Sequence, residues 1–234
     1  MGKFENRVVL VSGAAGNLGK AVASAFYEAG ADLALSDLHP EPLMSAFADS
    51  SRVMVLECDL MKPDSTETMV RNVLDRFGRI DAVAALTGGF SMGGPLHETS
   101  VDDWEFMMKL NTATLFNIAH AVLPHMRRRR EGRIVTVGAR AALSGRARMA
   151  AYTASKAAVI RMTESMSEEN KLYGINVNCV LPSIIDTPLN RRDMPDADFT
   201  TWVSPAALAD VIMFLASDAS RAIHGASIPV YGLS

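Results

Sequence analysis

The stretch RVVLVSGAAGNLGKAVASAFYEAG, residues 7–30, carries the pattern that decides the fold. It opens with a short β-branched run, Arg7–Ser12, which predicts a buried strand. It continues as an apolar-periodic segment, Asn17–Ala29, which predicts a helix that ends before Gly30. A strand, a glycine-rich turn and a helix in this order are typical of the first unit of a doubly wound α/β fold.

The glycine-rich turn predicts a site for the phosphates of a dinucleotide. Gly13, Gly16 and Gly19 lack a Cβ, so the turn can close tightly and its amides can approach a pyrophosphate at the helix N-terminus. The spacing GxxGxxG differs from the general GxGxxG fingerprint, and an ordinary strand–helix turn is the alternative. The predicted phosphate-side contacts are Gly13, Ala15, Asn17, Leu18 and Gly19.

The rest of the chain repeats the alternation of strand and helix. The predicted strands are Arg7–Ser12, Asp32–Asp37, Arg52–Glu57, Ile80–Leu86, Arg133–Val137, Ile175–Leu181 and Ala226–Tyr231. They are short, mostly apolar and not strictly alternating, which fits a parallel sheet covered on both faces. We therefore predict an α/β fold, a single-domain doubly wound Rossmann fold over residues 1–234, with a mostly or fully parallel sheet of about seven strands.

Two connections are longer than such a fold needs, residues 87–100 and residues 183–203. Both follow predicted strands, and ligands of doubly wound folds bind beyond the carboxyl ends of the strands. We expect these two loops to surround the substrate.

Asp37 ends the second predicted strand, eighteen residues after Gly19. A carboxylate there can accept hydrogen bonds from both ribose hydroxyls of NAD and would repel the extra phosphate of NADP. No basic residue stands at Ala14, at Ala15 or directly after Asp37 to bind that phosphate. We therefore predict NAD as the cofactor; the alternative is a strand-end Asp that faces solvent.

Tyr152 and Lys156 stand four residues apart at the start of the long predicted helix Ala150–Tyr173. That spacing places the phenol and the ammonium on one helix face. A free Tyr has a pKa near ~10, and a neighbouring cation favours the phenolate and lowers that pKa. The pair therefore predicts an acid/base centre, in which we expect Lys156, together with the positive nicotinamide ring of an oxidised cofactor, to lower the pKa of Tyr152.

Together these features resemble the short-chain dehydrogenase/reductase family over essentially the whole chain. The matching pieces are the turn at residues 12–19, Cys58-Asp59-Leu60, Asn111, Tyr152 with Lys156, and Pro182 followed by Thr187-Pro188. The resemblance implies cofactor contacts at Asp59, Leu60, Lys156 and Thr187, with Asp59 at the adenine and Thr187 at the nicotinamide amide. It also implies that Asn111 helps hold a proton-relay water near Lys156. The alternative is that Asn111 is only a residue in the interior of a helix and that Thr187 only forms a turn with Pro188.

The chain departs from the family where a catalytic Ser is usual. Ala139 stands thirteen residues before Tyr152, and its methyl group cannot hold a substrate oxygen. Either the substrate needs less help at that oxygen, or a nearby hydroxyl, with Ser144 as the candidate, replaces the Ser.

A second local resemblance, to dihydropteridine reductase, is carried by Gly88-Gly89, by residues 138–143 and by the loop from Asp186 to Trp202. It implies an NADH-linked reductase able to act without the Ser. In this loop Phe199 and Trp202 either contact substrate or pack the loop against the body.

Composition excludes several other classes of function. The formal net charge of −3 argues against a nucleic-acid partner, and we interpret the basic run Arg127–Arg130 as the end of a helix followed by Gly132. The two cysteines are interpreted as reduced core residues, and no apolar run predicts a signal peptide or a membrane span, so we expect a cytoplasmic protein. The five histidines show no spacing for a metal site.

The sequence leaves two functional hypotheses. The first is an NAD(H)-dependent oxidoreductase that transfers hydride between nicotinamide and a small-molecule substrate, with Tyr152, Lys156 and Asn111 as catalytic residues. Its substrate is a carbonyl or alcohol, or a dihydropterin-like heterocycle. The second is a non-catalytic dinucleotide-binding redox sensor or regulatory protein. In either case we expect a homodimer or homotetramer formed through the long helices 101–126 and 150–173.

Overall fold

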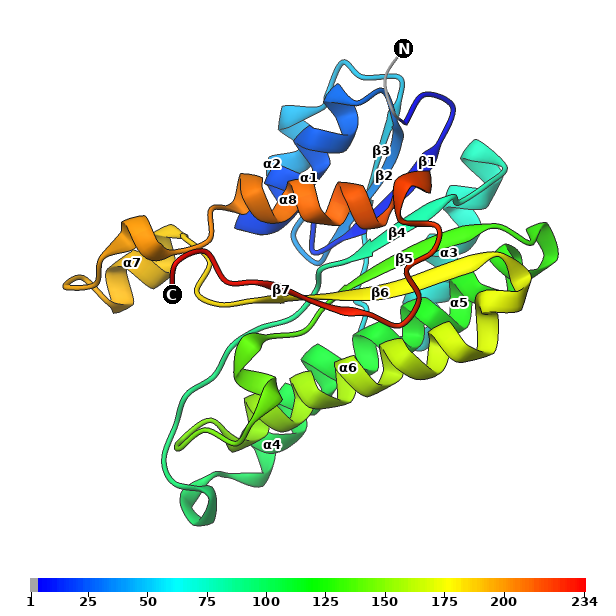
Figure 1. Ribbon diagram of the computed structural model, residues 1–234. Coiled ribbons are helices and arrows are strands. Elements are labelled where there is room, and N and C mark those ends of the chain that lie inside the picture. Colours follow the sequence, from blue (N-terminus) through cyan, green and yellow to red (C-terminus); the bar gives the residue numbers. More distant parts are fainter. Residues whose placement is uncertain (1–3) are drawn as a thin grey trace.

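The computed structural model describes residues 4–234, and within that range the strands form one parallel sheet of seven (Figure 1). The strand order is β3-β2-β1-β4-β5-β6-β7, and each neighbouring pair is parallel. The strands are β1 (Val8–Ser12), β2 (Asp32–Asp37), β3 (Val53–Glu57), β4 (Ala82–Ala85), β5 (Gly132–Val137), β6 (Ile175–Pro182) and β7 (Ser227–Val230). The α/β fold and the all-parallel sheet predicted from sequence are confirmed; residues 1–3 lie outside the described range.

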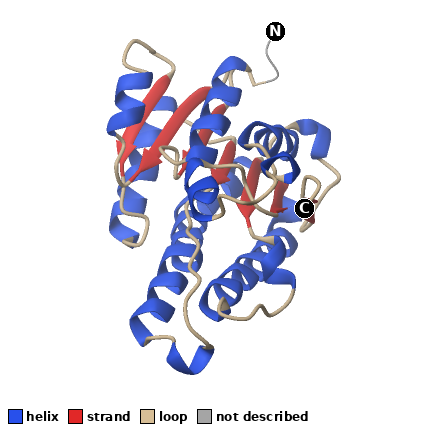
Figure 2. Ribbon diagram, turned by 90° about the vertical axis from the view of Figure 1, so that its left-hand side faces the viewer, coloured by secondary structure: helices blue, strands red, loops and turns tan. Residues whose placement is uncertain are grey.

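Helices cover both faces of the sheet (Figure 2). The α-helices are α1 (Asn17–Glu28), α2 (Glu41–Ala46), α3 (Pro63–Phe77), α4 (Val101–Met108), α5 (Thr114–Arg129), α6 (Ala150–Asn170), α7 (Pro188–Asp193) and α8 (Pro205–Leu215). One hydrophobic core joins α1, α2 and α8 to the sheet, and a second core joins α3, α5 and α6 to it. Both faces of the strands are therefore buried, which explains their continuous apolar runs.

The strand order reverses direction at β1. The chain moves outward from β1 to β2 and β3, and then returns to place β4 on the other side of β1. The connections that leave β1 and β4 therefore diverge to opposite faces and open a crevice at the carboxyl ends of these strands. This crevice fixes the position of the functional site.

The long helix predicted over residues 101–126 is interrupted. A π-helical turn, η2 (Lys109–Ala113), separates α4 from α5, and Asn111 lies within it. π-turns are rare in proteins and often occur at functional sites. The second long helix is formed as α6, which ends in a 3-10 turn, η4 (Lys171–Tyr173), before Gly174.

The basic run at residues 127–130 does end a helix, but the predicted role of Gly132 is wrong. Arg130 itself adopts the left-handed conformation, with φ 57°, and Gly132 already begins β5. The guanidinium groups of Arg127 and Arg130 lie 4.1 and 5.5 Å from the ring centre of Tyr173, so these two exposed cations contact an aromatic ring of the same chain.

No helix within residues 4–234 is long and apolar enough to cross a membrane.

Candidate active site

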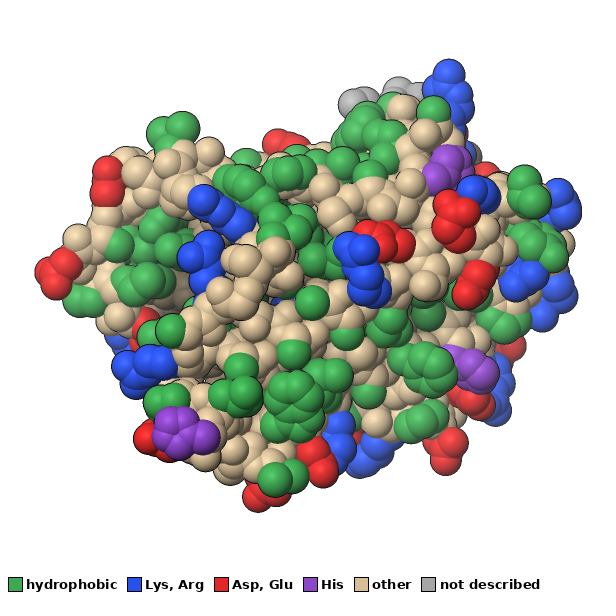
Figure 3. Space-filling view, turned by 60° about the horizontal axis from the view of Figure 1, so that its bottom comes forward, with side chains coloured by type: hydrophobic (Ala, Val, Ile, Leu, Met, Phe, Trp, Pro, Cys, Tyr) green, Lys and Arg blue, Asp and Glu red, His purple; other side chains and the backbone are tan. Residues whose placement is uncertain are grey.

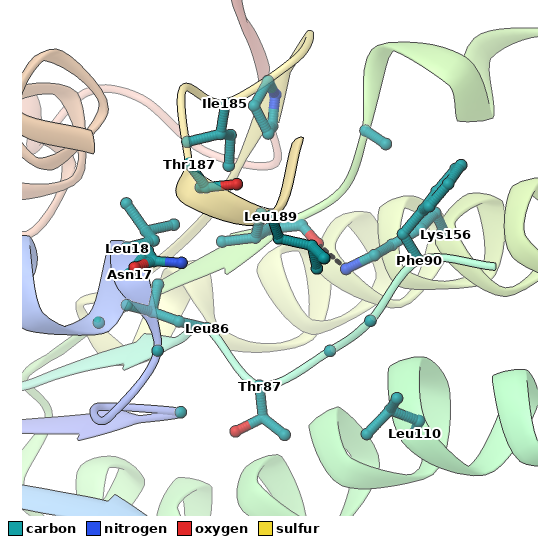
Figure 4. A pocket seen from close by; sticks show the side chains of 18 of the residues that line it. Asn17, Leu18, Leu86, Thr87, Phe90, Leu110, Lys156, Ile185, Thr187 and Leu189 are labelled. Atoms are coloured by element: carbon teal, nitrogen blue, oxygen red, sulfur yellow. Dashed lines mark hydrogen bonds between the residues drawn. The ribbon is translucent and has the colours of Figure 1, made fainter. Parts of the chain in front are cut away.

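A cavity of about 1370 Å³ lies at the carboxyl ends of the strands. Its lining comes from the ends of the six strands β1 to β6 and from the loops that follow them. The cavity exceeds the usual size of a small-ligand pocket, so it can hold a dinucleotide and a second molecule together. Figure 4 shows part of the lining, in which Asn17, Thr87, Lys156 and Thr187 come from four different segments.

The glycine-rich turn forms the floor of one end of the cavity. Gly13 has a φ of 64°, and a Cβ built on Gly19 would lie 2.1 Å from the Gly13 carbonyl oxygen. Both positions therefore require glycine. Gly16 precedes α1, so no side chain caps the first amides of this helix. An uncapped helix N-terminus beside a bare turn fits the pyrophosphate of a dinucleotide.

Two carboxylates that the sequence predicts as cofactor contacts line the cavity near the carboxyl ends of β2 and β3. Asp37 at the end of β2 accepts hydrogen bonds from the amides of Ala15 (3.0 Å) and His39 (3.1 Å). Asp59 after β3 accepts from the Met61 amide (3.0 Å) and pairs with the Lys62 ammonium at 3.2 Å. The cavity lining also includes the predicted contact Leu60.

Ser12 joins the end of β1 to the residues that follow β4 at the crevice. The sequence did not single out its side chain. Its hydroxyl oxygen accepts hydrogen bonds from the Leu86 amide (3.2 Å), the Thr87 amide (3.3 Å) and the Thr87 hydroxyl (3.1 Å). The end of β1 is thereby tied to the first residues after β4. A Ser in the last position of an otherwise apolar strand was the available signal.

Lys156 is 6% exposed, and its ammonium donates a hydrogen bond of 2.8 Å to the Val137 carbonyl at the end of β5 (Figure 4). Burial of the charged form lowers the pKa of Lys156 to about 8, against a small opposing effect of Cys179. A Cβ on Gly88 would come within 2.9 Å of this ammonium and 2.6 Å of the Asn111 side-chain oxygen. A side chain at position 88 would therefore collide with both groups, and glycine leaves room for them.

Asn111 connects three segments of the site. Its side-chain oxygen accepts from the Gly89 amide at 2.9 Å, and its nitrogen donates to the Gly89 carbonyl at 3.1 Å and the Ser155 hydroxyl at 3.0 Å. The π-turn carries this buried amide to the start of the 87–100 loop and to α6. Asn111 and Lys156 lie near each other, as the resemblance implies, because both side chains contact the space next to Gly88.

Tyr152 lies in the cavity lining one turn before Lys156. Its ring meets the ring of Phe90 edge to face, with 4.9 Å between centroids and an interplanar angle of 78°. Burial raises the pKa of Tyr152 to about 12. Lys156 alone does not lower this pKa, because burial disfavours the phenolate while the Lys156 ammonium is directed to the Val137 carbonyl. The joint lowering expected from Lys156 and an oxidised nicotinamide ring stays a prediction.

The remaining predicted residues divide into two groups. Ala139 and Thr187 line the cavity, and the Thr187 hydroxyl accepts from the Asn190 amide at 3.2 Å to begin α7. Ser144, Phe199 and Trp202 lie outside the lining. The 3-10 turn over Arg140–Leu143 carries Ser144 to an exposed position, and the rings of Phe199 and Trp202 pack on each other at 4.8 Å. This geometry favours the packing interpretation of the aromatic pair.

A further set of apolar side chains lines the cavity, and all of them but Met149 come from the two loops, residues 87–100 and 183–203, that the sequence singled out. They are Phe90, Met92, Met149, Ile184, Leu189 and Met194. Figure 3 shows a hollow on the left of the molecule, with hydrophobic side chains inside it and basic side chains near its rim. Ser234 reaches the same region, where its side chain hydrogen-bonds Ser183 at 2.8 Å. Within the described part of the chain, no group of three His, Cys, Asp or Glu side chains could hold a metal ion.

Comparison with known proteins shows to which family the chain belongs. The family model described as short chain dehydrogenase matches residues 7–198. A hydroxy(phenyl)methylsuccinyl-CoA dehydrogenase subunit of Thauera aromatica is 32% identical, covering 98% of this chain and 96% of the relative. The 3-oxoacyl-acyl-carrier-protein reductase FabG of Thermotoga maritima is 31% identical, with 98% of each chain covered.

Among solved structures, NAD⁺-bound xylitol dehydrogenase superposes with a TM-score of 0.91 at 27% identity, and 98% of this chain and 99% of the other are covered. The fold, the family match over most of the chain and the relatives that span its whole length agree. The chain belongs to the short-chain dehydrogenase/reductase family of oxidoreductases.

Proposed function

We propose that the protein is an NAD(H)-dependent oxidoreductase that transfers hydride between nicotinamide and a carbonyl or alcohol, or a dihydropterin-like substrate, with Tyr152 as acid/base. The observation that carries this proposal is that one cavity is lined by the Gly13–Gly19 turn, Asp37, Lys156 and Tyr152. The turn fits a pyrophosphate, and the Tyr152–Lys156 pair stands at the far side of the same space. A bound nicotinamide dinucleotide would supply or accept the hydride.

The residues of this chain supply the proton and the geometry. In reduction Tyr152 donates its phenolic proton to the substrate oxygen or nitrogen. The raised pKa makes this donation harder, so positive charge is needed beside the phenolate that forms. Lys156 stands one helical turn away. With a pKa of about 8 it is mostly an ammonium at pH 7, and its positive charge stabilises the phenolate that remains after the proton is donated. Asn111 holds Gly89 and Ser155 in place, and Ser155 directly precedes Lys156 in α6.

Ala139 narrows the choice of substrates. It is 4% exposed and lines the cavity, so a methyl group stands where the family usually has a hydroxyl. The exposed position of Ser144 argues against its acting as the replacement in this conformation. A substrate whose reacting atom needs one hydrogen-bond donor suits this site better than one that needs two.

Asp37 is proposed to select NADH over NADPH. Its carboxylate is fixed by the Ala15 and His39 amides beside the glycine-rich turn, where a 2′-phosphate would meet a like charge. For Asp37→Asn we expect the ratio of the NADH and NADPH dissociation constants to shift by about tenfold toward NADPH. Fluorescence titration of both coenzymes measures this ratio, and an unchanged ratio would remove Asp37 from the selection.

The catalytic proposal is tested by NADH oxidation with quinonoid dihydropterin, acetoacetyl thioesters and simple ketones measured side by side. We expect turnover with at least one of these classes. A rate confined to the pterin would assign the dihydropterin-like substrate, and a rate confined to the ketones would discard it. Tight NADH binding without turnover, unaffected by Tyr152→Phe in every assay, would instead support a redox sensor.

The two long helical segments are proposed to form the interface of a homodimer or homotetramer. Trp104, Phe106 and Phe116 on α4 and α5 are exposed, and large apolar side chains on neighbouring helices are typical of contact surfaces. Light scattering of the wild type and of Phe116→Glu tests this proposal. A smaller particle for the variant supports it, and an equal mass for both contradicts it.

A further inference from the structure

The loop of residues 87–100 is fastened to the segment that precedes α6. The Gly93 amide donates to the Arg148 carbonyl at 2.9 Å, and the Arg148 Nε donates to the Gly93 carbonyl at 2.8 Å. These two hydrogen bonds join residues that are 55 apart in the chain. Arg148 has a φ of 65°, a left-handed conformation that a non-glycine residue rarely adopts unless its surroundings hold it. We name this reciprocal pair the Gly93–Arg148 clasp.

The clasp holds Phe90 at the reactive end of the cavity. Phe90 precedes Gly93 by three residues, and its ring lies edge to face against Tyr152 at 4.9 Å. The side chain is nevertheless 59% exposed and lines the cavity, so part of its surface is available to a bound molecule. An aromatic ring held against the proton donor and open on another side can pack a substrate next to the reacting atom.

Several other apolar side chains line the same cavity as Phe90, together with polar groups such as Arg146. Met92 lies in the same loop, Met149 precedes α6, and Leu189 lies in α7. Thioether side chains adapt their shape and make favourable contacts with aromatic rings. The methyl group of Ala139 adds to this wall. A flat aromatic group can pack on Phe90 and on these apolar side chains, which offer no hydrogen bonds to a polar substituent at that position.

We propose that Phe90, held in place by the Gly93–Arg148 clasp, determines substrate specificity and selects substrates that carry an aromatic ring next to the reacting carbon or nitrogen. The inference rests on the proposed function, since it assigns the substrate class of the same site. Phe90 binds the ring of the substrate, and Arg148 is a positioning residue that acts through the loop.

Two diketones with the same reacting groups test this assignment. In 1-phenyl-1,2-propanedione a phenyl group replaces one methyl group of 2,3-butanedione. For the NADH-dependent reduction by the wild type, we expect kcat/KM to be roughly 10-fold higher for the phenyl compound. Phe90→Ala is expected to reduce this ratio to about 2 or less, while Phe90→Tyr, which keeps the ring, retains most of it. Leu96→Ala is the matched control, an exposed apolar residue of the same loop outside the cavity lining.

The role of Arg148 has its own pair of variants. Arg148→Ala is expected to lower the phenyl-to-methyl ratio about 3-fold, mainly through KM, because the loop is released and the chemistry is untouched. Arg148→Lys, which keeps a donor for the Gly93 carbonyl, is expected to restore part of the ratio. Arg71→Ala, an exposed arginine on α3, is the control and is expected to leave the ratio unchanged.

A binding measurement separates this inference from the proposed function. NADH-loaded Tyr152→Phe protein keeps the aromatic ring beside Phe90 but lacks the phenolic proton, so calorimetry with both diketones reports affinity without turnover. Tighter binding of the phenyl compound that disappears when Phe90→Ala is added supports the inference, even if the wild type reduces neither diketone. Equal affinities for the two diketones, or a difference that survives Phe90→Ala, overturn it. Failure of the proposed function is recognised separately, by the absence of NADH binding to the wild type.

Discussion

At the amino-terminal ends of β1, β4 and β5 acidic and basic side chains neutralise one another, whereas at the carboxyl-terminal end of β5 a buried ammonium binds a main-chain carbonyl. Asp81, with its side chain 1% exposed, accepts hydrogen bonds from the Val8 amide, Arg79 and Arg129. Burial alone would raise the pKa of this carboxyl group. The hydrogen bonds and the two guanidinium charges outweigh burial, so the pKa of Asp81 is lowered.

The carboxyl-terminal ends show the opposite balance. Burial dominates there, and it raises the pKa of Tyr152 to about 12 and lowers the pKa of Lys156 to about 8. Both shifts mean that burial disfavours the charged form of the side chain. We infer that the charged groups at the amino-terminal end stabilise the fold, while those at the carboxyl-terminal end are kept for function at a cost in stability.

The largest effect on stability is expected at the amino-terminal end. Asp81→Asn keeps the shape of the side chain but removes the charge that faces Arg79 and Arg129, so the free energy of unfolding should fall by about 3 kcal/mol. Because the pKa of Asp81 is lowered in the fold, its contribution is present at neutral pH. This contribution is lost as the pH falls from about 4, the ordinary pKa of an Asp, to the lowered pKa in the fold. The stabilities of the two proteins should therefore become equal at that low pH.

Urea unfolding at several pH values measures this difference. Glu131→Gln, which changes a more exposed partner in the same network, is the control and should cost less than about 1 kcal/mol. NADH affinity should stay unchanged in both variants. A loss of NADH affinity in Asp81→Asn at temperatures where it is folded would contradict the separation of the two ends.

Gly19→Ala is expected to have the next largest effect, at the carboxyl-terminal end. The added methyl group would lie 2.1 Å from the Gly13 carbonyl oxygen and 2.6 Å from the Ala14 Cα, so the turn must open. We expect NADH affinity to fall by about 100-fold. Gly145→Ala, where the added methyl group meets nothing within 4 Å, is the control for the titration. Equal affinities for the two variants would show that this turn does not hold the phosphates.

A smaller effect of opposite sign is expected for Lys156→Met. The pKa of Lys156 is about 8 in the fold against an ordinary 10.5, and the difference between these values corresponds to roughly 3 kcal/mol of destabilisation below pH 8. Loss of the hydrogen bond to Val137 offsets about 1 kcal/mol of the gain. The variant should therefore be more stable than the wild type by about 1–2 kcal/mol at pH 7, and inactive.

The sign of the pH dependence follows from the same values. Between pH 8 and 10.5 the unfolded wild type binds more protons at Lys156 than the folded protein does, so wild-type stability rises with pH in that window. The advantage of Lys156→Met should shrink over the same range in chemical denaturation curves. A variant less stable than the wild type at pH 7 would contradict the cost assigned to the buried ammonium.

Local signals explain what the sequence predicted well. The strand–turn–helix at residues 8–28 and the Tyr152–Lys156 pair depend on neighbours within one or two turns, so spacing and residue type were sufficient. Strand ends differ from the predictions by one or two residues, as at β4, because terminal hydrogen bonds depend on the adjacent strands.

Features set by distant contacts were not predictable. The π-turn at Asn111 depends on hydrogen bonds to Gly89 and Ser155, and the clasp joins Gly93 to Arg148 across 55 residues. The loop of residues 183–203 contains α7, a helix of six residues that is too short to show a periodic apolar pattern in the sequence. For the same reason the sequence could not place Ser144 outside the cavity, since this depends on how the preceding turn packs.

The most direct test of the account compares the wild type with Tyr152→Phe in NADH-dependent reduction of the best substrate from the panel, with NADH affinity measured for both proteins. The account predicts a loss of about 10²–10⁴-fold in kcat/KM with NADH affinity unchanged, because the variant lacks the phenolic proton and keeps the cofactor site. Equal turnover in the two proteins, or no affinity of the wild type for NADH, would contradict it.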